Sequence, residues 1–344
     1  MRLYALLLTL AVISVFAAAC DTGSSTETQT EDSTSSAHVD AHASDGSKDA
    51  SSTPSDTSTP PTGGEIDHCQ GTWFETIAEN VDIADIRQSY TSTQWYSSLI
   101  EVAKRAYPAW GETFVSATSE AERNRRGWYD GVTETLDEVG LLGILNTAVH
   151  EGCHGYTYGL TEKGGSDTYR LQIGPHEAHE VTIPRMLGGK PWPTRGSITA
   201  LMPENLKTNA FYTLYFTDSE MPGMKDHDIE GLIDEYSCYL HGDVASIALG
   251  LRDNGLIDVV SWQLFAILYL RQMKLSDPAQ FNALKAERHL VGMFLTLHDR
   301  ASFIHTVGAS RGLEETQGTA SLKAELASAD NTAMVAELRD AYCK

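Results

Sequence analysis

The most informative stretch of the chain, Asn146–Tyr156, reads NTAVHEGCHGY and follows an apolar run that begins at Leu141. Residues four apart lie on one face of an α-helix, so a helix here places His150 and His154 side by side. Glu151 is rotated about 100° from His150, at the edge of that face. The two residues between Glu151 and His154 carry no charge, as suits a helix packed against a core. The stretch therefore predicts a buried helix that presents two histidines and a carboxylate.

This spacing, HExxH, can hold a metal ion, because both imidazole rings reach one ion from the same helical face. Zinc binds imidazole and carboxylate ligands in four-coordinate sites, so we expect Zn²⁺ as the cofactor. Glu151 would reach a metal-bound water without binding the metal, and would act as general base. The pattern resembles that of the zincin metallopeptidases over this short stretch. The resemblance implies hydrolysis of a peptide bond, with His150 and His154 as metal ligands.

A zinc site of this kind needs a third protein ligand. The metzincin branch would supply a histidine, but its motif needs glycine and histidine where the chain has Thr157 and Leu160. A glutamate shortly downstream would fall in 176–180, which looks β-like rather than helical. The best candidate is Glu235. This resembles the gluzincin arrangement, in which a glutamate from a second helix completes the site, although the interval from His154 is far longer than the common one.

Glu235 belongs to a predicted helix over 228–250 in which small and polar residues share one face. These residues are Asp228, Gly231, Glu235, Cys238 and Gly242. The two glycines would let this helix approach another helix closely.

The part of the chain expected to fold contains four cysteines, Cys69, Cys153, Cys238 and Cys343. An even number of cysteines in an exported protein favours disulfides. We favour Cys69–Cys343, which would join the two ends of the domain. We also favour Cys153–Cys238, because each lies about 60° around its helix from an expected metal ligand. Buried free thiols at 153 and 238, or a zinc site made of all four cysteines, are the alternatives; no CxxC pair supports the latter.

Several side chains near the ligands are candidates for supporting roles. Tyr239 and His241 are the preferred candidates to stabilise the oxyanion that forms when water attacks a carbonyl. Asp234 would face away from the metal, either into solvent or toward a hydrogen bond with a ligand histidine. Asn146, one turn before the first histidine, is either a partner of the site or a surface amide.

The amino-terminal part of the chain is expected to contain an export signal followed by a flexible tether. Residues 1–19 combine a positive start, an apolar run and small residues directly before Cys20, which is similar to a bacterial lipoprotein signal. Cys20 is then the expected lipidated residue; ordinary secretion with cleavage near Ala19 is the alternative. Residues 20–64 are rich in Ser, Thr and Asp and contain no aromatic residue, so they predict a disordered tether. The folded domain is expected at 65–344.

The domain is expected to be α+β, mostly helical and zincin-like, with a small β-region between the two ligand helices. Helices are predicted at 86–107, 120–139, 228–250, 258–274, 278–298 and 321–341. Strands are predicted at 169–173, 180–183 and 211–216, between clusters of Gly and Pro. The β-region would form one wall of the substrate cleft, where an extended peptide pairs with a sheet edge.

The charge of the chain narrows the expected partners. There are 25 Lys+Arg against 47 Asp+Glu, a formal net charge of -22. Nucleic acids and anionic membrane surfaces both repel such a chain. No nucleic-acid partner is therefore expected, and a membrane is expected only through the lipid anchor. The resemblance to zincins implies a peptide or protein substrate, and a monomer is expected.

The expected function is that of a lipid-anchored zinc peptidase in the bacterial cell envelope. One alternative is an inactive cell-surface binding or structural lipoprotein that keeps the same fold. Glu151 argues against it, because a purely structural metal site needs no base. The other alternative is that the motif arose by chance in a helical surface module.

Overall fold

The computed structural model describes residues 66–126, 129, 131–165, 167–251, 256–313 and 316–344. The expected signal segment 1–19, the expected lipidated Cys20 and the tether 20–64 lie outside the described residues. Within the described part, no helix combines the length and the apolar character needed to cross a membrane.

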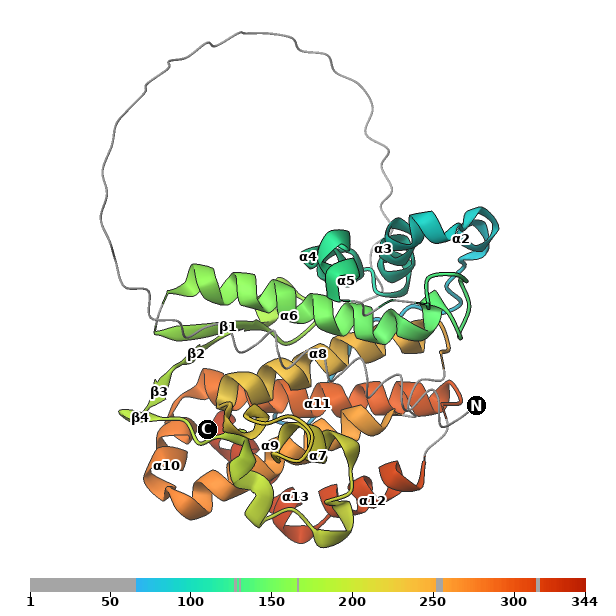
Figure 1. Cartoon of the computed structure of the whole chain (residues 1–344). Helices are drawn as coiled ribbons and strands as arrows, with labels where there is room; N and C mark the ends of the chain where they lie inside the picture. Colours follow the sequence, from blue (N-terminus) through green and yellow to red (C-terminus); the bar gives the residue numbers. More distant parts are fainter. Residues whose placement is uncertain (1–65, 127–128, 130, 166, 252–255, 314–315) are drawn as a thin grey trace, which may run out of the picture.

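Helices dominate the described residues, and the strands form two small antiparallel pairs, so the expected α+β class is confirmed (Figure 1). The α-helices are α2 (Ala84–Ser89), α3 (Trp95–Ala106), α4 (Gly111–Ala117), α5 (Glu120–Arg126), α6 (Leu145–Gly164), α7 (Ala210–Tyr215), α8 (Ile229–Ala248), α9 (Ile257–Ser276), α10 (Pro278–Ala286), α11 (Arg288–Ser310), α12 (Gln317–Leu326) and α13 (Ala329–Tyr342). The 3₁₀ turns are η1 (Ser92–Gln94), η2 (Leu141–Ile144), η3 (Glu177–His179), η4 (Arg195–Ala200), η5 (Glu204–Leu206) and η6 (Met224–Asp226). The strands are β1 (Thr168–Gln172), β2 (Glu180–Pro184), β3 (Met186–Leu187) and β4 (Lys190–Pro191).

Helix α8 forms the centre of the domain and α6 packs along it (Figure 1). The side chain of Asp228 caps α8 by accepting a hydrogen bond from the backbone N–H of Glu230 at 2.9 Å, which satisfies a donor that the helix leaves open. Every residue of α8 from Tyr236 to Ala248 is buried. A Cβ on Gly242 would lie 2.5 Å from Oδ1 of Asn146 on α6. Glycine at this position therefore allows the two helices to approach as closely as they do.

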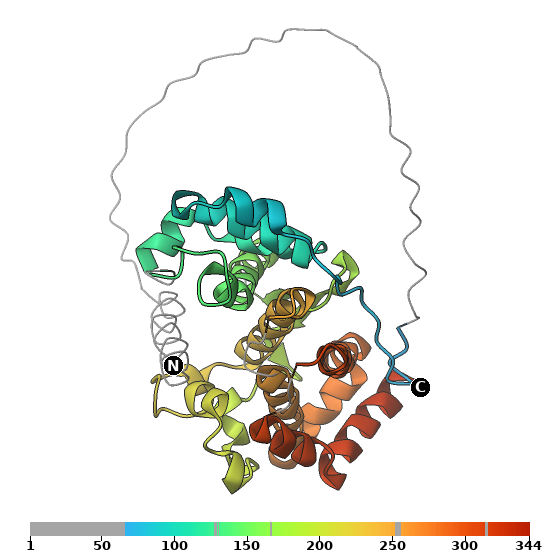
Figure 2. The same ribbon diagram turned by 90° about the vertical axis from the view of Figure 1, so that its right-hand side faces the viewer.

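The helical pair α6–α8 lies between two groups of helices, with α2–α5 on the α6 side and α9–α13 on the α8 side (Figures 1 and 2). Helix α4 packs so closely on α6 that a Cβ on Gly152 would lie 1.9 Å from the carbonyl oxygen of Phe114. The glycine inside the HExxH pattern is therefore required by packing. On the other side, the aromatic core of α9 contains Trp262, Phe265 and Tyr269, all with no exposed surface.

The β-region follows α6 directly. Strands β1 and β2 pair antiparallel, with Tyr169 opposite Ile183 and Leu171 opposite Val181, which confirms the strands predicted at 169–173 and 180–183. The other edge of β1 is already occupied. Arg170 N donates to Oγ1 of Thr161 on α6, and the carbonyl of Gln172 accepts hydrogen bonds from α8. This edge of β1 is therefore closed to a peptide at these positions.

The strand predicted at 211–216 is wrong, because this stretch forms helix α7. The Asn209 side chain caps α7 by accepting a hydrogen bond from the backbone N–H of Tyr212 at 3.0 Å. The rings of Phe211 and Tyr215 are buried. Aromatic residues favour strands only weakly when packing can use them on a helix, and here the cap and the burial decide.

The predicted helix at 120–139 is also wrong beyond Arg126, where α5 ends. Within the rest of the predicted range, Gly131 has a φ of 80°, a left-handed conformation that does not occur inside a right-handed α-helix. Three other predicted helices, 86–107, 278–298 and 321–341, are each divided by a short break. The breaks lie at extended or irregular backbone, for example at Tyr90 and Glu287.

Two disulfides join the cysteines in the pairing that the sequence favours. Cys69 and Cys343 are 5.8 Å apart between Cα atoms, and Cys153 and Cys238 are 5.4 Å apart. Both distances lie in the range that a disulfide requires. The first bridge fastens the amino-terminal segment to the end of α13, and the second fastens α6 to α8. All four cysteines are thus paired. This pairing contradicts both alternatives, free thiols at 153 and 238 and a zinc site made of four cysteines.

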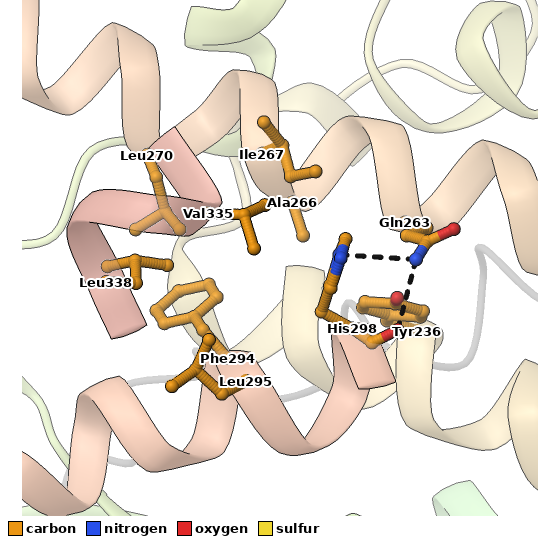
Figure 3. Close-up of a pocket in the computed structure, with 10 residues that line it drawn as sticks. All are labelled: Tyr236, Gln263, Ala266, Ile267, Leu270, Phe294, Leu295, His298, Val335 and Leu338. Atoms are coloured by element: carbon orange, nitrogen blue, oxygen red, sulfur yellow. Dashed lines mark hydrogen bonds between the residues drawn. The ribbon is translucent and has the colours of Figure 1, made fainter. Parts of the chain in front are cut away.

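A small internal cavity lies among α8, α9, α11 and α13 (Figure 3). Its volume is about 10 Å³, roughly the room that one water molecule needs. The side-chain amide of Gln263 reaches His298 at its edge, with 3.2 Å between Gln263 Nε2 and His298 Nδ1 (Figure 3). This cavity is too small for a peptide. It is lined by none of the expected site residues His150, Glu151, His154 and Glu235.

Candidate metal centre

Three side-chain atoms from α6 and α8 converge between the two helices. His150 Nε2 lies 3.0 Å from His154 Nε2. Glu235 Oε2 lies 3.5 Å from each of these nitrogens. The structure thus brings together two histidines one helical turn apart and a glutamate 81 positions further along the chain. We call these three residues the candidate centre.

The distances fit a tetrahedral zinc ion. Zinc bonds of about 2.0–2.1 Å at tetrahedral angles place neighbouring ligand atoms about 3.3 Å apart. The three measured separations lie close to that value on either side. Glu235 Oε2 is also buried, and its polar contacts in the structure are the two imidazole rings at 3.5 Å, an arrangement that suits a cation shared among the three side chains. Both observations are independent of the sequence motif and fit a bound metal ion.

The ionisable side chains of the candidate centre shift one another's pKa in the direction that favours a bound cation. Burial by itself would lower the pKa of His154, but the carboxylates of Asp234 and Glu235 outweigh burial and raise this pKa well above its usual value. Burial lowers the pKa of His150. Burial opposes ionisation of Glu235, yet His154 and His150 hold the pKa of Glu235 below its usual range. The two carboxylates thus favour positive charge among these ligand atoms.

No family model, curated protein or solved structure matches the chain. What the candidate centre binds is therefore inferred from its own ligand atoms and surroundings.

Glu151 stands beside the candidate centre. Its Oε1 lies 3.6 Å from His150 Nε2, and with His150 and His154 it forms a group whose ligand atoms lie within 4.8 Å of one another. Glu235 is the better third ligand, because one oxygen lies at the same 3.5 Å from both histidines. Glu151 is left at the edge of the group, where a base would act on a water molecule.

Asp234 holds His154 in place. Its Oδ2 lies 2.6 Å from His154 Nδ1, the ring nitrogen that points away from His150. A carboxylate on this nitrogen fixes the ring and leaves Nε2 directed at the metal position. Of the two roles left open for Asp234, the structure shows the hydrogen bond to a histidine. Asp234 and His154 also form the open side of the centre, with side chains 21% and 24% exposed against 6% for His150.

Tyr239 packs its ring edge against His150, with 4.2 Å between ring centroids. Its hydroxyl is 3.1 Å from the hydroxyl of Tyr215 on α7. Burial and then the Glu235 carboxylate raise the pKa of both phenols, so both keep their protons and can donate. Sequence reasoning missed Tyr215, because the stretch that holds it was read as a strand.

His241 does not join the candidate centre. It is fully buried on another face of α8, where Nδ1 lies 2.8 Å from the hydroxyl of Tyr107 and Nε2 lies 3.1 Å from the carbonyl oxygen of Gln172. The guanidinium of Arg300 lies beside the same ring and forms an ion pair with Glu75 at 2.9 Å. These contacts account for His241 as a structural residue, which corrects its expected role as an oxyanion stabiliser.

Asn146 is a buried partner of α8 rather than a surface amide. Its Nδ2 donates to Oδ1 of Asp243 at 2.8 Å. Because Asn146 lies one turn before His150, this bond fixes the start of the ligand helix against α8. Asp258 on α9 is buried nearby, and burial raises its pKa.

His179, in the stretch considered for a third ligand, lies elsewhere. Its ring packs on Trp73, with 5.1 Å between centroids, and burial lowers its pKa to about 4.

Proposed function

We propose that the chain is an exported, lipid-anchored zinc peptidase with a gluzincin-like site. His150, His154 and Glu235 hold the zinc ion, and Glu151 acts as general base. The observation that supports this most is the convergence of the three ligand atoms, one of them a buried carboxylate oxygen, at 3.0–3.5 Å. Glu151 in the same group favours a hydrolytic centre over a structural one, because a structural centre needs no base.

Bound zinc would supply Lewis acidity toward water and toward the substrate carbonyl. Glu151 accepts the proton that the attacking water loses and then delivers it to the leaving amine. Asp234 keeps the His154 ring in its binding orientation. Tyr239, together with Tyr215, would donate a hydrogen bond toward negative charge that develops beside His150.

The peptide is proposed to reach the centre from the side of His154 and Asp234, where the side chains are most exposed. Glu230 lies one turn before Asp234 on α8, and burial, together with Asp234 and Asp228, raises its pKa to about 7. Glu230 is therefore only partly ionised near pH 7, and it is mainly the carboxylate of Asp234 that favours neutral or basic peptides over acidic ones.

The test compares zinc content and peptide hydrolysis in the wild type and in Glu151→Gln. Each protein is saturated with zinc, freed of excess metal and analysed by elemental mass spectrometry; each is then incubated with a mixture of unrelated peptides. We expect one zinc per chain in both proteins and cleavage by the wild type alone. Zinc in both with cleavage in neither would favour the inactive binding lipoprotein, and folded wild type without zinc would overturn the proposal.

The lipid anchor is a separate part of this proposal and rests on the sequence around Cys20. In a bacterial host supplied with a labelled fatty acid, the full chain should incorporate label and partition with membranes. Cys20→Ser is the matched control and should do neither. Equal label in both proteins would contradict the anchor.

A further inference from the structure

The disulfide Cys153–Cys238 is built into the candidate centre itself. Cys153 directly precedes His154, and Cys238 lies one turn after Asp234 on α8. Both cysteines are fully buried. The bridge therefore joins the two ligand helices at the level of the metal, next to the carboxylate that orients a ligand.

A second group of metal-binding atoms lies on the far side of the His154 ring. Cys238 Sγ is 3.7 Å from Oδ1 of Asp234, whose Oδ2 faces His154 Nδ1. The ligand atoms of His154, Asp234 and Cys238 all lie within 4.8 Å of one another. Imidazole, carboxylate and thiolate are all zinc ligands, and thiolate is the soft one that zinc binds strongly. A disulfide sulfur carries no such charge.

We propose that the disulfide keeps a competing zinc site closed, a proposal that rests on the zinc centre proposed above. When the bond is absent, Cys238 joins His154 and Asp234 as a thiolate ligand, and zinc binds there through His154 Nδ1. This ion takes Asp234 away from its orienting role and draws the same histidine, through Nδ1, toward a second metal position. Zinc bound in this way lies away from Glu151 and supports no hydrolysis.

The chemistry of the switch is a two-electron reduction. Two equivalents of a thiol reductant break the S–S bond, each cysteine sulfur gains a hydrogen, and the reductant leaves as its own disulfide. The Cys238 thiol then loses its proton on binding zinc. Both sulfurs are buried in the folded domain, so a thiol reductant reaches the formed bond poorly. The competing site is therefore available mainly in a chain that has not yet formed this bond.

Two single variants make a matched pair for testing this idea. Cys153→Ser and Cys238→Ser both remove the bridge and both keep one cysteine of the pair. Only Cys153→Ser keeps the sulfur that lies with His154 and Asp234. Cobalt(II) replaces zinc as the probe, because a thiolate ligand gives it a strong near-ultraviolet charge-transfer band that nitrogen and oxygen ligands do not give.

We expect the thiolate–cobalt band in Cys153→Ser and its absence in the wild type and in Cys238→Ser. Adding Asp234→Asn to Cys153→Ser should weaken the band. With zinc, peptide hydrolysis by Cys153→Ser should fall at least about 10-fold below that of Cys238→Ser, as expected when the partner of a ligand histidine is lost. The same band in both single variants, or in neither, would overturn the inference.

A second preparation covers the case in which Cys153→Ser does not fold. Wild type unfolded, reduced with a phosphine, and refolded with cobalt under anaerobic conditions should show the band and lose it on reoxidation. Wild type that binds no cobalt at all would count against the zinc centre itself. Cobalt bound by the wild type, without a sulfur band in the reduced protein, would count against this inference alone.

Discussion

Asp234 Oδ2 lies 2.6 Å from Nδ1 of His154, and the next residue along α8 is Glu235, the proposed third metal ligand. One turn of α8 thus supplies both a ligand and the group that orients another ligand. The neighbouring residues point to opposite sides of the His154 ring, because Glu235 faces Nε2 and Asp234 faces Nδ1. The helix geometry therefore fixes the ring between two carboxylates.

Asp234→Asn should weaken zinc binding about 10–100-fold, because the amide holds the His154 ring less firmly and does not supply negative charge. Competition with a chromophoric chelator measures the affinity. Asp226→Asn, which changes an exposed carboxylate just before α8, is the control and should bind zinc like the wild type. Equal affinities for Asp234→Asn and the control would show that this hydrogen bond does not support the metal.

Zinc should stabilise the folded chain, since the centre forms only when α6 and α8 are packed together. Zinc at about 100 times its Kd adds about 2.7 kcal/mol to the free energy of unfolding. For a domain of this size that raises Tm by several degrees. Differential scanning calorimetry with zinc and with chelator measures the shift. The variant His150→Ala/His154→Ala should show almost none of it, and a shift equal to that of the wild type would place zinc elsewhere.

The two disulfides should differ in their response to a mild reductant. Cys69 and Cys343 are exposed, whereas Cys153 and Cys238 are fully buried, so a thiol reaches the first bridge far more easily. Brief reduction under native conditions, followed by alkylation and mass spectrometry, should label Cys69 and Cys343 alone. Simultaneous labelling of all four cysteines would contradict the burial of the second bridge.

Loss of the terminal bridge should lower stability without changing the centre. Replacing Cys69 and Cys343 by serine removes a link across 274 positions, and such links contribute about 2–5 kcal/mol to the free energy of unfolding. Urea unfolding measures this loss. Zinc affinity should stay at the wild-type value, because α6 and α8 remain joined by their own disulfide.

The buried His241 predicts how stability depends on pH. Burial, then the charge of Arg300, lowers the pKa of His241 well below its usual value, whereas in the unfolded chain it is about 6.5. Below that pH the unfolded chain binds one more proton at His241 than the folded chain does. The stability that neutral, buried His241 contributes is therefore present above about pH 6.5 and is lost as the pH falls. The loss from this group is up to about 1.4 kcal/mol per pH unit.

His241→Gln tests this contribution. Urea unfolding of metal-free protein from pH 7 to pH 5 should give a shallower pH dependence for the variant than for the wild type. Zinc affinity at pH 7 should be nearly unchanged, because His241 lies outside the candidate centre. Parallel pH profiles for the two proteins would contradict the neutral, buried state of His241.

The sequence predicted the parts of the candidate centre that depend on helical spacing. His150 and His154 share a face because they are four residues apart, and Glu235 shares a face with Cys238 and Gly242 for the same reason. The cysteine pairing then followed from placing these two faces together. Helical spacing was therefore enough to predict which residues of α6 and α8 face each other.

The sequence could not predict features that depend on packing between distant segments. Tyr215 lies beside Tyr239 because Asn209 caps a short helix, whereas the aromatic composition of this stretch predicts a strand. The expected role of His241 was wrong because neighbouring positions on α8 face different partners. Its partners are Tyr107, directly after α3, and Arg300 on α11, which lie far apart in the chain. Hydrogen bonding by Thr161 closed a strand edge in a way that no local pattern indicates.

The most direct test of the central claim is X-ray absorption spectroscopy of the disulfide-bonded wild type loaded with one equivalent of zinc. We predict a first shell of four nitrogen and oxygen atoms at about 2.0–2.1 Å, with the outer-shell scattering of two imidazole rings and no sulfur. Glu235→Ala should lose zinc or show a changed shell. Folded wild type that retains no zinc, or a shell with fewer than two imidazoles, would contradict a metal centre built from His150, His154 and Glu235.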